Sequence, residues 1–299
     1  MKVLVTGGTG FLGRHLKTNK PSWIYISSRD YDLRKKAHCA QMFKDIKPDA
    51  VIHLAARVGG IKANAENQAL FYYENTVINT NVIHQAHLSG VKRLLAALST
   101  CSFPDKVKEY PLTEKDLFAG PPASTNFSYG FTKRAMHIQC VSYRKQYGLN
   151  YSTFCPSNIY GPDDHFDSEK SHFVPAMITK IAKEDLRVLK LWGTGKPLRQ
   201  QLYVDDLCQI IPMLLEKHNS DIPIIVAPNE NLSIRQMALE GLKLFDKDVK
   251  LEFNNNLDGQ YRKDGSNKEL LKLVGDFEFT TFKDGLRKTY DWYVGSKKE

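Results

Sequence analysis

The stretch "VTGGTGFLG", Val5 to Gly13, decides the fold, because it joins the end of an apolar run to three spaced glycines and a helix start. Gly7, Gly10 and Gly13 stand three residues apart. Glycines at this spacing allow a tight turn and let a pyrophosphate approach the backbone, where a helix N-terminus offers free N–H groups. The stretch therefore predicts a dinucleotide-binding strand, turn and helix; a purely structural glycine-rich turn is the alternative.

Strand-like and helix-like segments alternate from this stretch to about residue 160. The expected strands cover residues 2–7, 23–29, 50–56, 93–100 and 151–161, and the expected helices cover 11–19, a stretch through 42–46, 67–89 and 128–147. Short apolar runs between helices are typical of a parallel sheet covered on both faces. The sequence predicts an α/β fold, a doubly wound parallel sheet of the Rossmann type with a smaller, discontinuous C-terminal α/β substrate lobe.

The regularity weakens after Gly161, where strands and helices become short and mixed. Helices are expected from Val204 and from near Ser233, and the segment 258–275 is expected to be polar at first and then helical. We expect the nucleotide-binding domain to comprise residues 1–160 and about 194–218. The substrate domain is then expected from about 161–193 and 219–299.

Composition and charge narrow the function classes. The chain has 299 residues, of which 42% are hydrophobic and 25% charged, with a formal net charge of +9. A nucleic-acid interface concentrates its basic residues, whereas here lysines and arginines are spread along the chain. We therefore expect no nucleic-acid partner, and the positive field suits a phosphate-bearing small molecule.

The cysteines and the N-terminus indicate the compartment. No apolar stretch approaches the ~20 residues that a membrane span needs, and the chain begins with a strand-like run, so we expect neither a membrane anchor nor a targeting segment. Five scattered cysteines without a CxxC pair argue against a disulfide framework and against a zinc site. This usage fits a reducing cytoplasm.

The end of the second strand, Ser27-Ser28-Arg29-Asp30, indicates the cofactor. An acidic residue at this place binds ribose hydroxyls, whereas arginine and hydroxyl groups suit a 2′-phosphate. Arg29 and the serines favour NADP, and Arg14 could contribute from the first helix. Asp30 keeps NAD open, and either arginine could be an ordinary surface residue.

Two further motifs carry acid–base chemistry. "LSTCSFPD", residues 98–105, places Ser99 and Cys101 at a strand end, and "YGFTK" places Tyr129 and Lys133 on one helix face. A phenol is a poor acid–base group at neutral pH, but a neighbouring ammonium stabilises the phenolate and brings its pKa toward the working range. Singly, Cys101 could be a small buried hydrophobe, and Tyr129 and Lys133 a core tyrosine and a surface lysine. Together, Ser99, Tyr129 and Lys133 resemble the triad of short-chain dehydrogenases/reductases.

The resemblance becomes specific over the whole chain. "HLAARVGGIKAN", "LSTCSFPDK", "YGFTKRAM", "CPSNIYGPDDHF", "SHFVPAMI", "WGTGKPLRQQLYVDDL" and "DGQYRKDGSN" follow in order and are similar to the GDP-L-fucose synthase family, from Met1 to about Val294. The resemblance implies NADPH-dependent 3,5-epimerisation and 4-reduction of GDP-4-keto-6-deoxy-D-mannose to GDP-L-fucose. It also implies a homodimer formed through the helices near 67–89 and 128–147.

The resemblance assigns roles to particular residues. It implies that Ser99 and Tyr129 bind the sugar C4 carbonyl, that Lys133 holds the nicotinamide ribose and lowers the pKa of the tyrosine, and that Cys101 and His172 form the epimerising acid–base pair. The implied cofactor-binding residues are Gly7, Gly10, Phe11, Leu12, Gly13, Arg14, Arg29, Tyr129 and Lys133. The implied substrate-binding residues are Asn64, Asn158, Trp192, Arg199 and Lys263, of which Arg199 and Lys263 would meet the pyrophosphate. Two alternatives stay open: His172 could be an ordinary loop histidine, and Arg199 and Lys263 could be surface charges.

Some positions depart from the family pattern. Ser102 follows the cysteine where an aliphatic residue is usual, Gln201 and Gln68 replace an aromatic residue and a proline, and Phe173 is larger than usual. One or two side chains can retune a sugar pocket. Two alternatives therefore stay open: a reductase or epimerase of a related nucleotide-linked 4-keto sugar, and a non-catalytic NADP-binding regulator on the same fold.

Overall fold

A six-stranded parallel sheet forms the centre of the computed structural model, which describes residues 1–167, 171–255 and 258–296. The sheet order is β10-β5-β4-β3-β1-β2. Its strands, in chain order, are β1 (Val3–Thr6), β2 (Ile24–Ile26), β3 (Ala50–His53), β4 (Arg93–Ala97), β5 (Asn150–Pro156) and β10 (Ile224–Val226). The predicted doubly wound parallel sheet is confirmed.

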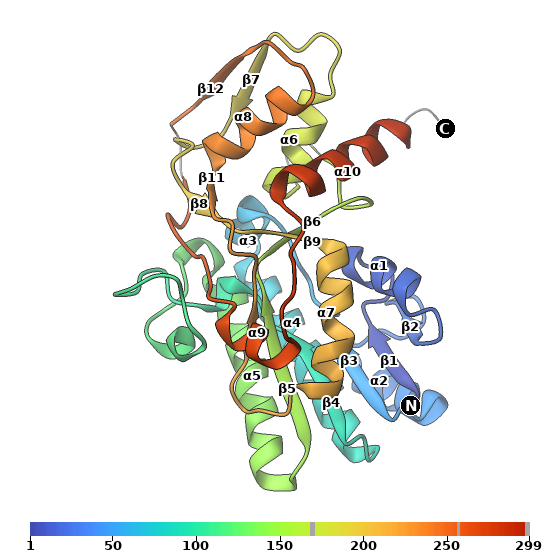
Figure 1. The fold of residues 1–299 in the computed structure, drawn as a ribbon. Helices are drawn as coiled ribbons and strands as arrows, with labels where there is room; N and C mark the ends of the chain where they lie inside the picture. The colour runs from blue at the N-terminus through green and yellow to red at the C-terminus, as the bar shows by residue number, and fades with distance from the viewer. Residues whose placement is uncertain (168–170, 256–257, 297–299) are drawn as a thin grey trace.

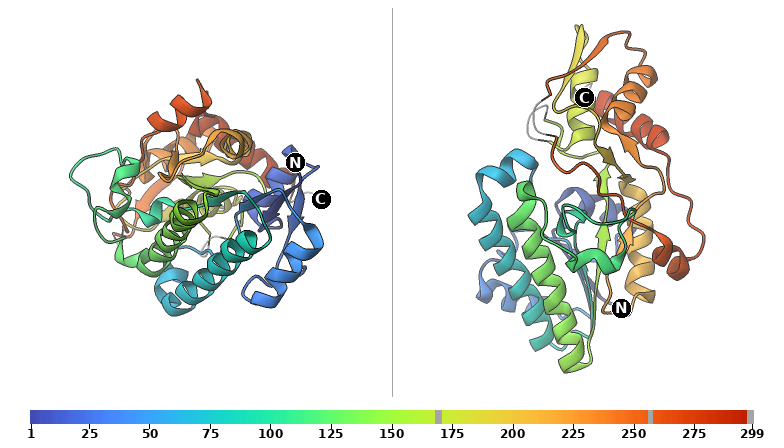
Figure 2. Two further views of the ribbon diagram at one scale, coloured as in Figure 1. Left: turned by 90° about the horizontal axis from the view of Figure 1, so that it is seen from below. Right: turned by 90° about the vertical axis from the view of Figure 1, so that its left-hand side faces the viewer.

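Helices cover both faces of this sheet, as the two views of Figure 2 show. The helices α2 (Lys36–Ile46), α4 (Gln68–Leu88) and α5 (Phe127–Tyr147) pack on one face, and α1 (Phe11–Asn19) and α7 (Val204–Lys217) pack on the other. Strand residues alternate between the two cores, since Leu94 and Ala96 of β4 face α4 and α5 while Leu95 and Ala97 face α7. Each large buried aliphatic side chain contributes about 1.5–3 kcal/mol, so both cores fix the position of the strand ends.

The expected strand over 151–161 is two strands. β5 ends at Pro156, and after Ser157 the chain continues as β6 (Asn158–Tyr160), which pairs with β9 (Gln201–Tyr203) outside the main sheet. Pro156 has no N–H to continue the ladder. The Ser157 N–H donates to the Val226 carbonyl at 2.9 Å, which anchors the point where the chain leaves the sheet.

The C-terminal lobe stands above the carboxyl ends of the strands (Figure 1). It contains α6 (Phe173–Ile181), α8 (Ile234–Leu244) and α10 (Phe282–Gly295), with two small pairings: β7 (Val188–Leu191) with β12 (Lys250–Phe253), and β8 (Leu198–Arg199) with β11 (Leu232–Ser233). The expected start of α8 at Ser233 is confirmed, because the Ser233 hydroxyl caps it by accepting from the Gln236 N–H. The lobe has its own core, built around Met177, Ile178, Leu189, Met237 and Leu286.

The chain crosses between the two parts more often than the sequence indicated. β10 pairs with Phe154, Cys155 and Pro156 of β5, and α9 (Lys268–Val274) packs against α7 and β10. Both elements fall in the range expected for the substrate lobe, yet they belong to the sheet layer. The apolar run of β10 and Leu270 of α9 are buried there, which explains their place.

The remaining elements are short: α3 (Ile61–Glu66), η1 (Thr100–Ser102), η2 (Glu114–Phe118) and η3 (Ser124–Asn126). Within the described residues, we find no helix that combines the length and the apolar character of a membrane span.

Candidate active site

The glycine turn after β1 is shaped to receive a pyrophosphate. Gly7 has φ +75°, and a Cβ there would lie 2.9 Å from the backbone nitrogen of Ala55, while a Cβ on Gly13 would collide with the Gly7 carbonyl oxygen. Gly10 is the N-cap of α1, and no side chain among the described residues caps that helix. The first-turn N–H groups of Phe11 and Leu12 are therefore available to an anion, so these residues fit a dinucleotide.

The loop after β2 engages Asp30 and leaves Arg29 exposed. One carboxylate oxygen of Asp30 accepts from the Ser27 N–H at 2.7 Å and from the Ser27 hydroxyl at 2.8 Å. These bonds hold the pKa of Asp30 below its usual range and turn the carboxylate back toward its own loop. Ser28, Arg29 and Asp30 are all exposed here, but the Asp30 carboxylate is engaged by Ser27, so the Arg29 guanidinium is the exposed charge left for a ligand.

Arg14 is tied to the protein. Its guanidinium forms an ion pair with Asp163 and donates to the Asp163 carbonyl at 2.7 Å and the Thr9 carbonyl at 2.6 Å. Arg14 thus links the glycine turn to the loop after β6. This contact gives Arg14 a bridging role that the sequence did not indicate.

The turn after β4 carries Ser99 and Cys101. The Ser99 Oγ accepts from the Cys101 N–H at 3.2 Å, which leaves the hydroxyl hydrogen to be donated elsewhere. The helix α5 holds both sides of this turn, because the Lys133 Nζ donates to the Ala97 carbonyl at 2.8 Å and the Arg134 Nε donates to the Ser102 carbonyl at 2.5 Å. Arg134 directly follows the predicted Lys133, but its role as a clamp was missed.

Tyr129 and Lys133 lie one turn apart on α5, facing this turn. The Lys133 Nζ is 5.7 Å from the centre of the Tyr129 ring. Burial, and then the Cys101 and Cys155 thiols, raise the pKa of Tyr129, while burial lowers the pKa of Lys133 to about 8. The shift of Tyr129 is opposite to the one expected from Lys133 alone, so the phenol is neutral and ready to donate a proton.

A buried polar chain lies behind Lys133. The His53 Nδ1 shares a hydrogen bond with the Thr6 hydroxyl at 2.8 Å, and its Nε2 shares one with the Asn79 Oδ1 at 3.1 Å. Burial, and then the charge of Lys133, lower the pKa of His53 to about 3, so the imidazole is neutral. The chain links β1, β3 and α4 around Lys133. Its only local signal in the sequence is His53 itself, the polar last residue of β3.

Cys101 meets a lysine from a distant part of the chain. The Lys263 Nζ lies 3.8 Å from the Cys101 Sγ, and Arg199 of β8 also interacts electrostatically with this thiol. His172 precedes α6 at its N-cap; burial, and then the charges of Lys263 and His165, lower its pKa. His172 remains accessible to solvent. Lys263 thus contacts Cys101 and interacts electrostatically with His172, the two expected epimerisation groups.

The other expected substrate-binding residues differ in their surroundings. The Asn64 amide donates to the Gly59 carbonyl at 2.7 Å and the Gly60 carbonyl at 3.1 Å, so it shapes its own loop. Asn158 lies on β6, partly exposed, and Trp192 is 54% exposed just after β7. Trp192 therefore has a large apolar face available for a flat ligand.

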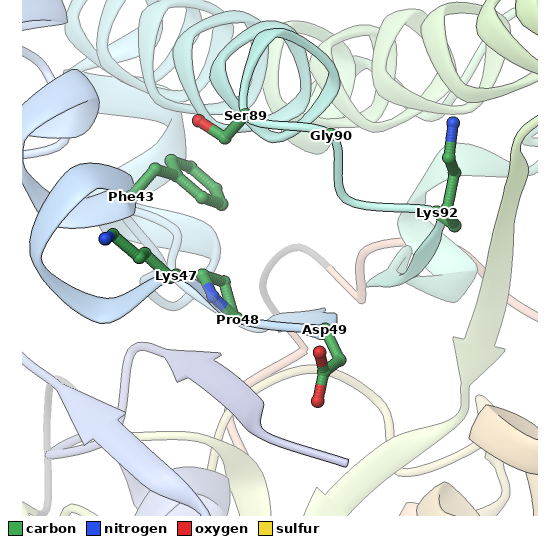
Figure 3. Close-up of a pocket in the computed structure, with 7 residues that line it drawn as sticks. All are labelled: Phe43, Lys47, Pro48, Asp49, Ser89, Gly90 and Lys92. Atoms are coloured by element: carbon green, nitrogen blue, oxygen red, sulfur yellow. The ribbon is translucent and has the colours of Figure 1, made fainter.

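A hollow at the opposite ends of the strands, their amino ends, is separate from this site (Figure 3). Phe43, Lys47, Pro48, Asp49, Ser89, Gly90 and Lys92 line it. These residues precede β3 and β4 or end the helices before them, so they lie at the amino ends of the strands. In doubly wound sheets, ligands bind at the carboxyl ends.

Known proteins are similar to this chain in sequence and in fold. The NAD dependent epimerase/dehydratase family model matches residues 3–227. A probable GDP-L-fucose synthase of Drosophila melanogaster is 36% identical over 312 residues, covering 98% of this chain and 97% of that protein. A GDP-L-fucose synthetase from Naegleria fowleri bound to NADP has a TM-score of 0.91 at 33% identity, covering 99% of this chain and 93% of that one. A GDP-6-OMe-4-keto-L-xylo-heptose reductase from C. jejuni has a TM-score of 0.90 at 27% identity, covering 99% and 98%.

Proposed function

The chain belongs to the NAD dependent epimerase/dehydratase family and to its GDP-L-fucose synthase branch, and we propose from its site that it converts GDP-4-keto-6-deoxy-D-mannose to GDP-L-fucose with NADPH. The observation that carries the proposal is the turn after β4. It presents the Ser99 hydroxyl and the Cys101 thiol together, so one group can hold a ketone oxygen while the other exchanges a carbon-bound proton.

Ser99, Tyr129 and Lys133 are proposed to carry the reduction. NADPH supplies a hydride to C4 when it is bound. The Ser99 hydroxyl and the neutral Tyr129 phenol then stabilise the charge that develops on the C4 oxygen, and Tyr129 gives it a proton. Lys133 holds the strand end through the Ala97 carbonyl. Its ammonium is also proposed to hold the nicotinamide ribose when the cofactor is bound.

Cys101 and His172 are proposed to carry the epimerisations. A C4 ketone acidifies the hydrogens on C3 and C5, because removing either one gives an enolate whose charge rests on the C4 oxygen. Inversion needs one group to take a proton from one face of the sugar and another to return a proton to the opposite face. A thiol and an imidazole can both titrate near neutral pH when a site tunes them. The lowered pKa of His172 keeps its imidazole largely neutral.

The lobe supplies the groups proposed to hold the GDP moiety. Arg199 is surrounded by protein, and burial lowers its pKa only against the opposing influence of Cys101 and Asp258. A guanidinium binds a pyrophosphate bidentately, and the exposed Trp192 ring can stack on a base. Asn158 lies on β6 between the two parts and completes the proposed set.

NADPH is expected to support turnover far better than NADH, because Arg29 can bind a 2′-phosphate while Asp30 is engaged by Ser27. A charge-assisted contact contributes about 1.5–3 kcal/mol, which corresponds to roughly one to two decades in affinity. Arg29→Ala is expected to remove most of the difference in kcat/KM between the two cofactors. Arg34→Ala is the matched control, since Arg34 is paired with Asp32 and Glu74 in the next loop and its loss should leave the preference unchanged. Equal kcat/KM for both cofactors in the unmodified protein would refute the assignment.

Identification of the product tests the function as a whole. The protein is incubated with GDP-4-keto-6-deoxymannose and NADPH, and the sugar product is identified by NMR. GDP-L-fucose supports the proposal. Reduction without inversion would favour the alternative of a reductase for related 4-keto sugars, and the absence of NADPH oxidation would favour a non-catalytic NADP-binding protein.

We also propose a homodimer formed through α4 and α5. These helices pack side by side, and their outer faces carry exposed Tyr73, Leu88, Ile138 and Tyr147. Such apolar residues on adjacent helices suit a helix-to-helix interface between two copies. Sedimentation at micromolar concentration should give about twice 34.1 kDa; a monomer at that concentration would contradict the proposal.

The compartment and the domain division remain part of the proposal. All five cysteines lie in the described ranges and are free thiols, which supports a cytoplasmic location. We propose that the NADP-binding domain is formed by residues 1–160, by the part of the expected 194–218 range that follows β8, and by β10 and α9. The rest of the chain would form the sugar-nucleotide domain.

A further inference from the structure

Lys263 lies beside a thiol, a position that a residue binding only the pyrophosphate would not need. The family resemblance assigns it to the pyrophosphate, but its Nζ lies 3.8 Å from the Cys101 Sγ, across 162 positions of sequence. Burial lowers the pKa of Lys263, and the interaction with Cys101 opposes that effect. The lysine and the thiol therefore form one electrostatic unit.

The segment that carries Lys263, residues 258–265 (hereafter the strap), is held from the lobe to the sheet. Toward the lobe, the Asp258 carboxylate accepts from the Thr194 N–H at 2.6 Å and from the Thr194 hydroxyl at 2.7 Å. In the middle, the Gln260 amide donates to the Pro104 and Asp105 carbonyls at 3.0 Å, just beyond the turn that carries Cys101. The strap is thus fixed to the residues that follow the turn carrying Cys101.

The other end of the strap is fixed as firmly. The Asp264 carbonyl accepts from the Leu112 N–H at 2.8 Å, and the Gly265 N–H donates to the Gln200 side chain at 2.8 Å. The Arg262 guanidinium pairs with the Asp264 carboxylate at 2.5 and 3.0 Å. The two charged residues on either side of Lys263 in the sequence are therefore paired with each other. Lys263 is left to face Cys101.

The other groups around the thiol reinforce a positive environment. Arg199 of β8 acts on Cys101, and Lys133 of α5 acts on the buried thiol of Cys155 on β5. Tyr129 of α5 and Cys155 are neutral, since burial raises the pKa of both. His172 before α6 interacts electrostatically with Lys263 and is largely neutral because burial, and then the charge of Lys263, lower its pKa. Fixed positive charge near a thiol favours the thiolate.

We propose that Lys263 is a positioning residue: its Nζ, 3.8 Å from the Cys101 Sγ, stabilises the negative charge that the sulfur carries when Cys101 acts as a base in the epimerisation; this role rests on the proposed function. In that step the thiolate sulfur takes a proton from the carbon beside C4. The C–H bond breaks, an S–H bond forms, and the electron pair moves onto the C4 oxygen, where Ser99 and Tyr129 stabilise it. The reaction needs no further reactant.

The pH dependence of thiol alkylation tests this proposal without any sugar substrate. The intact protein is treated with iodoacetamide between pH 5 and 10, and the rate at Cys101 is followed by mass spectrometry of its peptide. The other four cysteines are buried, so Cys101 should react first, and Cys101→Ser identifies its signal. Lys263→Met is expected to raise the midpoint of the alkylation profile by about 1–2 pH units, which makes alkylation at pH 7 about tenfold slower or more.

Two controls separate charge from packing. Lys263→Arg keeps the positive charge and should keep the midpoint near that of the unmodified protein, whereas Lys268→Met removes a similar charge from an exposed site on α9 and should change nothing. If Lys263→Met fails to fold, as judged by circular dichroism, Lys263→Gln replaces it with the same expectation. An unchanged midpoint in a folded Lys263→Met or Lys263→Gln protein would overturn the proposal, as would a Lys263→Arg profile that follows the methionine variant. Because alkylation needs no turnover, this result is independent of the product test.

Discussion

Tyr129→Phe is expected to lower the rate of NADPH oxidation by about two to four decades, the usual contribution of a positioned acid–base group. The substitution removes the hydroxyl that gives a proton to the C4 oxygen and keeps the ring that packs beside Lys133. Because burial raises the pKa of Tyr129, the phenol is in its proton-donating form throughout the neutral range. The loss should therefore appear in kcat across that whole range, as measured by NADPH absorbance with saturating keto-sugar.

Tyr143→Phe provides the matched control, since Tyr143 lies on the same helix and its hydroxyl meets the His84 Nδ1 of α4 at 2.7 Å, away from the turn after β4. That variant loses an identical group and should turn over at nearly the normal rate. Thermal unfolding of both variants checks that α5 is intact. Near-normal reduction by a folded Tyr129→Phe protein would refute the triad.

The parts of the site that the sequence predicted are those with local signals. The glycine spacing predicted the turn and the bounds of α1, and the spacing of Tyr129 and Lys133 placed both on one face of α5. Ser99 followed from its place at the end of β4, because parallel strands bring their carboxyl ends to one edge. Such features depend on a few neighbouring residues and on the regular geometry of strands and helices.

The contacts that the sequence did not predict join distant parts of the chain. Lys263 reaches Cys101 across 162 positions, and Arg14 reaches Asp163 across 149. β10 returns to the main sheet after α7 and pairs with β5. Its short apolar run looks the same as that of a strand in the lobe, so the sequence did not indicate this return. Each of these depends on how the chain crosses between sheet and lobe. The identity of a lysine or an arginine does not indicate which distant residue the fold will bring next to it.

Cys101→Ala is expected to separate the two chemistries of the site. In D₂O without NADPH, the unmodified protein should exchange deuterium into C3 and C5 of GDP-4-keto-6-deoxymannose, because the proposed base removes those hydrogens reversibly. The alanine variant should lose this exchange by about 100-fold or more, as measured by NMR of the recovered sugar nucleotide. Ser99, Tyr129 and Lys133 remain in place, so NADPH should still be oxidised, giving a reduced GDP-deoxyhexose that keeps its original configuration at C3 and C5.

Cys155→Ala tests whether the effect belongs to the position and not to thiols in general. Cys155 lies on β5 close enough to interact with Cys101, but it is fully buried and cannot reach a sugar. The Cys155→Ala protein also loses one thiol group, yet it should exchange deuterium into C3 and C5 at the normal rate. Each alanine variant loses one thiol, but only the thiol of Cys101 is proposed to reach the substrate. A Cys101→Ala protein that still exchanges C3 and C5 as fast as the unmodified one would show that the thiol is not the base, and would leave the turn after β4 with Ser99 as its one functional side chain.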